Sequence, residues 1–298
     1  MARFSTENFY RFPQATKMDL TFGGVEANVA AALSSMGVSS RHITRFPDNE
    51  IAKAAEAHFV KLGVDTGYFQ WGGDRLGIYY LEQGIGCRSG KVLFDRMGSA
   101  FCGIKKGMFD WQSILKEATW FHFSGINPAL SQGSADACIE ALEVCKKNNS
   151  TVSIDINYRK NLWQYGKTAS EVMPELISCA DIVIASVYDM ADQFGIPITN
   201  KTPFESFQNS ALELSKKFPT IKKIVTTYRE VANASENTIS SFLYENGKTI
   251  VSKNCKISTM VDRIGTGDAF AAGLIYGVMQ KWTNDYTCLL YTSPSPRD

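Results

Sequence analysis

Residues 262–273 read DRIGTGDAFAAG, and this stretch decides the fold and the chemistry that we expect. Gly265 and Gly267 bracket Thr266 directly before a predicted helix. Glycines at this place let backbone N–H groups face one point, and the start of a helix carries positive potential. Asp268 lies in the first turn, where it can accept a hydroxyl proton. The string therefore predicts an anion hole for a phosphoryl group with a base beside it.

A plainer interpretation of the same string stays open. Asp268 can simply cap the helix while the glycines make a turn, because short motifs occur by chance. The string is not the dinucleotide-binding fingerprint, since it lacks the third glycine and closes the series of strands and helices instead of opening it.

The chain upstream of this string alternates short apolar strands with amphipathic helices. This pattern predicts a parallel sheet with helices on both faces. The Asn246-Gly247 pair between two strand patterns predicts a hairpin. The expected strands span residues 120–123, 152–156, 181–185 and 224–227.

The first third of the chain mixes helices with strands. We expect helices at 25–36 and 50–62, the second capped by Asn49 or Asp48. Strand patterns at 76–81 and 92–94 are rich in aromatic and aliphatic residues. The expected fold is one α/β domain over residues 1–287. Its small β lid is formed by strands within about 1–24 and 66–95.

Composition limits the function classes. The formal net charge is +1, and no basic excess or polybasic run is present, which argues against nucleic-acid and membrane partners. The seven cysteines form no CxxC pair and are odd in number, so a disulfide framework and a zinc site are not expected. Reduced thiols in a cytoplasmic protein are the simplest interpretation.

Two arginines favour an acidic substrate. Arg96 and Arg159 lie at predicted strand ends that face one cleft, and a guanidinium binds a carboxylate in a bidentate manner. The alternative is structural pairing, of Arg96 with Asp95 or Glu82 and of Arg159 with Asp155.

DRIGTGDAFAAG resembles the C-terminal signature of the PfkB, or ribokinase-like, carbohydrate kinases. The segment at 23–30 (GGVEANVA) is similar to the turn and helix with which this family contacts its sugar. Segments at 76–82, 94–101, 121–131 and 155–163 are similar to one branch, the 2-keto-3-deoxygluconate kinases. The resemblance covers nearly the whole chain. It implies a ribokinase-like α/β fold, with a mostly parallel central sheet, helices on both faces and a small β lid.

The resemblance also implies roles for individual residues. Gly265, Thr266, Gly267 and Asp268 would be catalytic, the first three as an anion hole and Asp268 as the base. The substrate would contact Gly24, Asn28, Tyr79, Phe94, Arg96, Arg159 and Asp268. ATP would contact Asn157, Thr226, Arg229, Gly265 and Gly267, of which Thr226 and Arg229 would lie in a loop.

Two departures from the family affect the ATP and Mg²⁺ sites that the resemblance implies. Many members carry Asn-x-x-Glu where this chain has Ser186-Val187-Tyr188-Asp189, so Asp189 is the candidate metal ligand here. The usual glycine-rich nucleotide loop reads Thr-Thr-Tyr-Arg-Glu at 226–230, without glycine.

The resemblance further implies that the chain is shortened at both ends. Residues 1–5 correspond to the second strand of the family. Residues 288–298 (CLLYTSPSPRD) resemble a translated sequencing adapter, so we expect a non-native tail there.

The expected activity is phosphorylation of the terminal hydroxyl of 2-keto-3-deoxygluconate by MgATP. One alternative is a kinase for a neutral ketose such as fructose, or for another sugar acid. Another is a catalytically silent nucleotide- or sugar-binding module. A homo-oligomer formed through the β lid is the expected assembly, if there is one.

Overall fold

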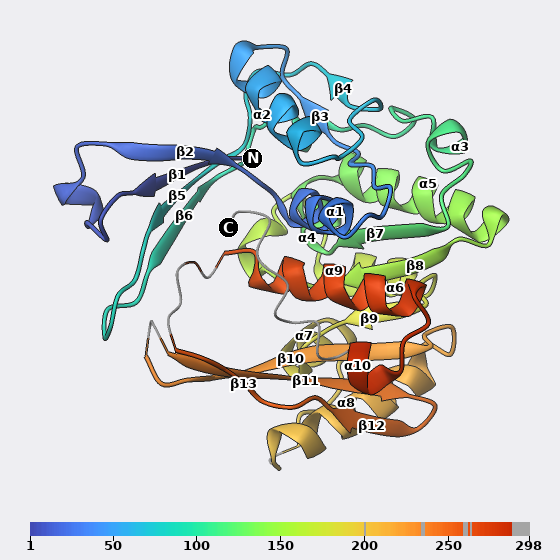
Figure 1. Cartoon of the computed structure of the whole chain (residues 1–298). Helices are drawn as coiled ribbons and strands as arrows, with labels where there is room; N and C mark the ends of the chain where they lie inside the picture. Colours follow the sequence, from blue (N-terminus) through green and yellow to red (C-terminus); the bar gives the residue numbers. More distant parts are fainter. Residues whose placement is uncertain (200, 234–235, 259–261, 263, 288–298) are drawn as a thin grey trace.

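The computed structural model describes residues 1–199, 201–233, 236–258, 262 and 264–287. Arg263 and the proposed tail at 288–298 lie outside these residues. A central sheet forms the body of the molecule, and a smaller sheet projects from it (Figure 1). The described residues include no helix that is long and apolar enough to cross a membrane.

The central sheet is mixed, with a parallel half and an antiparallel half. Its order is β12-β11-β10-β9-β8-β7, and β13 also pairs with β11. The pairs from β7 to β10 are parallel, as the sequence predicted, whereas β11, β12 and β13 pair antiparallel. The strands are β7 (Trp120–Ser124), β8 (Thr151–Asp155), β9 (Ile182–Ile184), β10 (Lys223–Val231), β11 (Asn237–Glu245), β12 (Lys248–Val251) and β13 (Cys255–Ile257).

Helices cover both faces of this sheet, which confirms the predicted α/β class. One face carries α1 (Val25–Ser35) and α9 (Thr266–Met279). The other face carries the helices that share the largest apolar core with β7, β8 and β9. They are α5 (Gln132–Asn148), α6 (Ala169–Ile177), α7 (Val187–Phe194) and α8 (Pro203–Lys217).

Helices α1 and α9 pack directly on one another. Their contact is built from small and branched side chains, among them Ala32 of α1 and Ala271 and Ala272 of α9. Alanine at these positions lets the two helices lie close, and burial of such apolar surface contributes roughly 25 cal/mol per Å². The packing holds two helix starts, at Gly24 and Gly265, beside the same cleft.

The lid is a four-stranded sheet in the order β2-β1-β5-β6. It extends away from the body on the left of Figure 1. β1 pairs antiparallel with β2 and parallel with β5, and β5 pairs antiparallel with β6. The strands are β1 (Ala2–Thr6), β2 (Met18–Phe22), β5 (Ile78–Glu82) and β6 (Lys91–Asp95).

A third, two-stranded sheet has its own small core. β3 (Arg45–Phe46) pairs with β4 (Gln70–Trp71), and α2 (Glu50–Lys61) packs beside them. The Asn49 side chain accepts a hydrogen bond from the N–H of Ala52, so Asn49 is the helix cap. The shorter helices are η1 (Phe12–Gln14), η2 (Phe101–Gly103), α3 (Trp111–Ile114), α4 (Ile126–Leu130), η3 (Lys160–Leu162) and α10 (Asn284–Thr287).

A partly buried ion pair ties the lid to the segment before α9. Arg3 of β1 donates to the carboxylate of Asp262 at 2.5 Å, and the two side chains are only 5% and 15% exposed. Asp262 also accepts from the backbone N–H of Ile264. The loop that leads into Gly265 is therefore held from the lid side.

Candidate active site

A cleft of about 450 Å³ lies where the lid, α1, the ends of the central strands and the start of α9 meet. Most of the residues that the sequence singled out line it. They are Gly24, Asn28, Tyr79, Phe94, Arg96, Asn157, Arg159, Asp189, Thr226, Gly265, Thr266, Gly267 and Asp268. Arg229 is the exception.

The start of α9 has the geometry of an anion site. Gly265 has φ +89°, a left-handed conformation that favours glycine, and it is the N-cap residue of α9. The first turn of a helix directs its backbone N–H groups outward, here those of Thr266 and Gly267. A Cβ added to Gly267 would meet no protein atom within 4 Å. The space in front of this turn is thus open to a ligand.

Asp268 is held next to this anion site by α1. Its side chain is buried, and its Oδ2 accepts a hydrogen bond from Asn28 Nδ2 at 2.5 Å. Asn28 Oδ1 in turn accepts from the N–H of Gly24 at 3.5 Å. The predicted substrate residues of α1 and the predicted base therefore belong to one hydrogen-bonded group.

The lid contributes an aromatic wall and a guanidinium. The rings of Tyr79 on β5 and Phe94 on β6 lie 5.8 Å apart, and the Arg96 guanidinium lies 3.9 Å above the Phe94 ring. The hydroxyl of Tyr79 and Nε of Arg96 are buried, with no hydrogen-bond partner among the described residues. Buried polar atoms of this kind are expected to meet a ligand or water.

The alternative of structural pairing for the two arginines is wrong. Arg75 pairs with Asp95, and Arg88 lies 3.9 Å from Glu82. Among the described residues, neither Arg96 nor Arg159 forms an ion pair.

Burial and the neighbouring charge of Arg159 lower the pKa of Arg96 to about 10. Arg159 itself donates to the carbonyl of Tyr158. Two guanidiniums that share one cleft and form no ion pair with a described carboxylate make their part of the cleft attractive to an anion.

Sequence reasoning missed Asp155, the last residue of β8, as a member of the site. Its carboxyl lines the cleft. Burial, with the nearby charges of Asp268 and Asp189, raises its pKa to about 8. The signal was available, because a carboxylate at the carboxyl end of a parallel strand lies where such sheets bind ligands. From the sequence, Asp155 is only an alternative partner for Arg159.

Asp189 faces the cleft, but its carboxylate is engaged by the protein. Oδ2 accepts from the N–H and hydroxyl of Ser186 in a capping box, and Oδ1 accepts from the N–H of Tyr158. The described residues include no group of three His, Cys, Asp or Glu side chains placed to hold a metal ion. They do not fit a cage made of protein ligands alone.

The predicted nucleotide residues lie on two elements. Asn157 follows β8 with φ +40°, and Thr226 lines the cleft from β10. Arg229 is also on β10 and donates to Thr266 Oγ1 at 2.9 Å. It therefore holds the first residue of α9 without lining the cleft itself. The expectation of a loop here is wrong, because residues 223–231 continue pairing with β11 as one long strand.

A second cavity of about 500 Å³ lies between α1, β7 and α5 and is lined mainly by apolar side chains. It contains His42 and His122, whose pKa values burial lowers to about 3 and about 4. Nδ1 of His122 is hydrogen-bonded to Ser153 Oγ at 2.8 Å, as expected for a core histidine. None of the predicted site residues lines this cavity, so we assign the chemistry to the cleft described above.

Comparison with known proteins agrees with this geometry. Residues 9–289 match the family model described as pfkB family carbohydrate kinase. The crystal structure of 2-dehydro-3-deoxygluconokinase from Thermotoga maritima superposes with a TM-score of 0.94 at 37% identity, covering 100% of this chain and 90% of that one. The 2-dehydro-3-deoxygalactonokinase of Haloferax volcanii is 28% identical over 92% of this chain and 80% of its own length. A 5-dehydro-2-deoxygluconokinase of Clostridium botulinum is 26% identical over 87% of this chain and 73% of its own.

The raised pKa of Asp155 predicts a pH-dependent stability. An unfolded aspartate titrates near pH ~3.9, so between roughly pH 4 and 8 the folded chain holds a proton that the unfolded chain releases. This term makes the folded state less stable as pH rises through that window. Asp155→Asn removes it and keeps the shape of the side chain. We expect the variant to match the parent in Tm at pH 4 and to exceed it by roughly 3 °C or more at pH 8.5.

Thermal melts of both proteins without ATP or Mg²⁺ measure this difference. An equal difference in Tm at the two pH values would contradict the assignment of a protonated Asp155.

Proposed function

The chain belongs to the pfkB family of carbohydrate kinases, and we propose that it transfers the γ-phosphoryl group of ATP to the terminal hydroxyl of 2-keto-3-deoxygluconate. The observation that carries this proposal is the pair Arg96 and Arg159, which share one cleft with Asp268 and have no protein carboxylate as partner among the described residues. The proposed product enters sugar-acid catabolism.

The guanidinium pair supports an acidic sugar as substrate. A neutral sugar needs hydroxyl partners only, whereas a sugar acid carries a carboxylate that a guanidinium binds through two parallel hydrogen bonds. A bound carboxylate would also offset the burial and the repulsion by Arg159 that lower the pKa of Arg96. The rings of Tyr79 and Phe94 would cover the apolar face of the sugar chain, and Gly24 and Asn28 would contact its hydroxyls.

Asp268 and the start of α9 support phosphoryl transfer. The transition state spreads negative charge over the transferred oxygens, and the N–H groups of Gly265, Thr266 and Gly267 would donate to them. Asp268 would accept the proton of the attacking hydroxyl. Asn28 fixes the orientation of that carboxylate. Since the nucleophile loses its proton late in such a reaction, orientation matters more than basicity.

We propose that ATP enters from the side of β8 and β10. Asn157 and Thr226 would contact its phosphates, and Arg229 would act through Thr266. Mg²⁺ usually binds through substrate phosphates and one or two carboxylates, so it would arrive with the nucleotide and neutralise phosphate charge. Asp189 is the candidate carboxylate from the sequence, although its oxygens already accept hydrogen bonds from Ser186 and Tyr158 at the start of α7.

The alternatives differ in what they require of the cleft. Relatives are named for the kinase reactions of three different sugar acids, so another sugar acid is the nearest alternative. A neutral ketose would leave the charges of Arg96 and Arg159 without a ligand group. A silent binding module would have no use for Asp268 beside the glycine-led helix.

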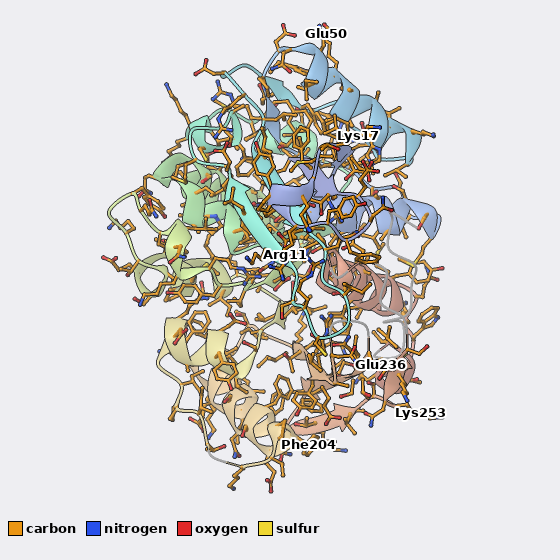
Figure 2. The ribbon with its side chains drawn as sticks, turned by 90° about the vertical axis from the view of Figure 1, so that its left-hand side faces the viewer. Arg11, Lys17, Glu50, Phe204, Glu236 and Lys253 are labelled. Atoms are coloured by element: carbon orange, nitrogen blue, oxygen red, sulfur yellow. The ribbon has the colours of Figure 1, made fainter. Side chains whose placement is uncertain are left out.

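We also propose a cytoplasmic homo-oligomer that associates through the lid. The six described cysteines are free thiols, which suits a reducing compartment. Figure 2 views the molecule from the lid side. Leu20 of β2 and Leu93 of β6 are 42% and 56% exposed and lie in one row across the lid sheet, and Met18 is exposed on the same face two residues before Leu20. Apolar surface that gathers in this way marks an interaction site.

The lid proposal predicts that Leu20→Glu together with Leu93→Glu dissociates the assembly. Charges would have to be buried at the contact, which is unfavourable. Light scattering after size exclusion should give a multiple of the chain mass for the parent and the single-chain mass for the variant. Lys216→Glu on the distant helix α8 serves as the control. A parent that is monomeric at tens of micromolar would exclude the proposal.

The acid proposal predicts that Arg96→Ala and Arg159→Ala each weaken use of a keto-deoxy sugar acid far more than use of fructose. A lost charge-assisted contact removes about 1.5–3 kcal/mol, which is roughly a 10- to 150-fold rise in KM. A coupled kinase assay over a panel of sugar acids and neutral sugars measures this. Equal loss on both classes, or a parent that prefers the neutral sugar, would show the acid proposal to be wrong.

The base assignment predicts that Asp268→Asn lowers kcat by about 10²- to 10⁴-fold, the usual effect of losing a general base. The amide oxygen of the new side chain can still accept from Asn28, so Tm and the Kd for ATP should stay close to the parent values. Near-normal turnover in this variant would exclude Asp268 as the base.

A further inference from the structure

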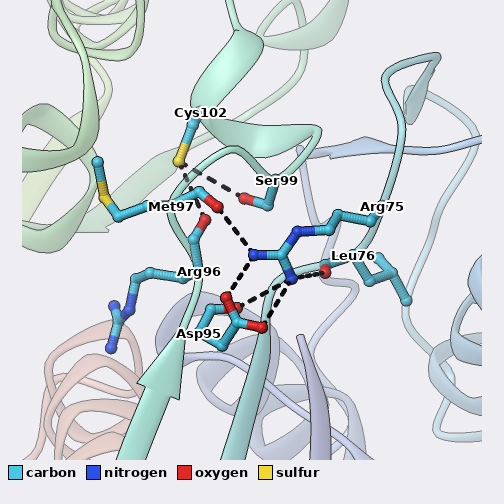
Figure 3. Close-up of polar contacts among 7 residues, drawn as sticks. All are labelled: Arg75, Leu76, Asp95, Arg96, Met97, Ser99 and Cys102. Carbon is cyan, nitrogen blue, oxygen red and sulfur yellow. Dashed lines mark hydrogen bonds and ion pairs between the residues drawn. The ribbon is translucent and has the colours of Figure 1, made fainter.

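Arg75, which no sequence pattern singled out, holds the backbone next to Arg96. Its guanidinium binds the carboxylate of Asp95 through two hydrogen bonds, Nη2 to Oδ1 at 2.5 Å and Nη1 to Oδ2 at 3.2 Å. The same group donates to the backbone carbonyls of Asp95 at 3.3 Å and of Met97 at 2.8 Å. Figure 3 shows these contacts around the end of β6. Arg75 therefore holds the residues on both sides of Arg96.

The carbonyl of Arg96 itself is also held. It accepts from the Cys102 thiol at 3.3 Å and from the N–H of Ser99 at 3.2 Å. The carbonyls of three consecutive residues, 95 to 97, are thus all hydrogen-bonded. In return, the backbone carbonyl of Arg75 accepts from the N–H of Ala100 at 2.9 Å. The backbone from the end of β6 to the next turn is fixed by these bonds.

This fixing acts where the sheet no longer does. The ladder between β5 and β6 ends at the pair Ile78 and Asp95, so Arg96 is the first residue beyond it. The Arg96 side chain rests on the Phe94 ring and forms no ion pair with a described residue. Figure 3 shows Arg75 and Arg96 extending to opposite sides of this segment. Arg75 is placed to direct Arg96 without touching a substrate.

We propose that Arg75, acting through Asp95 and the carbonyl of Met97, is a positioning residue that aims Arg96 at the substrate carboxylate. The proposal rests on the proposed function, because it assigns Arg75 a part in choosing acids over neutral sugars. A guanidinium binds a carboxylate strongly only when the two planes align, so a small shift of the Arg96 backbone weakens that contact.

A role in general stability does not account for this network. The side chains of Arg75 and Asp95 are 35% and 48% exposed, and exposed ion pairs contribute little to folding. The chain offers a matched control in Arg41 and Asp65, whose ion pair is 2.7 Å long with side chains 38% and 44% exposed. Arg41 also donates to a backbone carbonyl, that of Ile114, but it does not line the active-site cleft.

The test compares Arg75→Ala, Arg75→Lys and the control Arg41→Ala, in each case with kcat/KM for the keto-deoxy sugar acid and for a neutral ketose. We expect Arg75→Ala to lower the ratio of acid to ketose on the order of 10-fold, chiefly through KM. Arg75→Lys keeps the charge but not the paired hydrogen bonds, and it should fall between parent and alanine variant. Arg41→Ala should leave the ratio unchanged.

A double-mutant cycle with Arg96→Ala decides whether Arg75 acts through Arg96. If it does, Arg75→Ala has no further effect on the acid once Arg96 is absent. Additive losses, or a ratio that Arg75→Ala leaves at the parent value, would overturn the proposal. A fall of the ratio in Arg41→Ala to the same extent would overturn it too.

The cycle also separates this inference from the function on which it rests. Loss of acid preference in Arg96→Ala with none in Arg75→Ala rejects the positioning role alone. No loss of acid preference in Arg96→Ala rejects the acidic substrate and the positioning role together.

Discussion

The hydrogen bond between Asn28 and Asp268 is the contact on which the rest of the site depends. It joins the first turns of two helices that lie side by side on one face of the central sheet, and the alanines between those helices let them approach. Two helix starts are thereby aimed at one cleft, and both favour negative charge. A carboxylate can stay between them because it is held in one orientation, at the place where a hydroxyl and a phosphoryl group would meet.

The cleft collects like charges in two groups. The lid and the segment after β8 supply Arg96 and Arg159, whereas the strand ends and α9 supply Asp155, Asp189 and Asp268. Burial, and after it the like charges within each group, lowers the pKa of Arg96 and raises that of Asp155. A bound anion between the guanidiniums reverses the first effect. Ligand binding and protonation are therefore linked in this site, and each must change the other.

Sequence reasoning predicted what depends on local pattern. The glycine-led helix at 265, the cap at Asn49, the hairpin at Asn246 and the parallel strands all follow from residues close together in the chain. The contacts that could not be predicted join residues that are distant in the sequence. Asp95 was a candidate partner of Arg96, but it pairs with Arg75, which precedes the neighbouring strand β5. The ion pair of Arg3 with Asp262 could not be predicted for the same reason, because its partners lie far apart in the chain. The length of strand β10 was missed because the resemblance implied a nucleotide loop at residues 226–230.

The bonds that close the site join the two ends of the chain. Asn28 and Asp268 are 240 residues apart, and Arg3 and Asp262 are 259 apart. Contacts between such distant residues form late, because the intervening chain must first be ordered. During synthesis the lid and the parallel strands β7 to β10 can assemble while residues beyond 250 are still missing. The anion site at the start of α9, and the carboxylate that Asn28 holds beside it, therefore cannot form before residues 265–268 have been made and α9 has docked on α1.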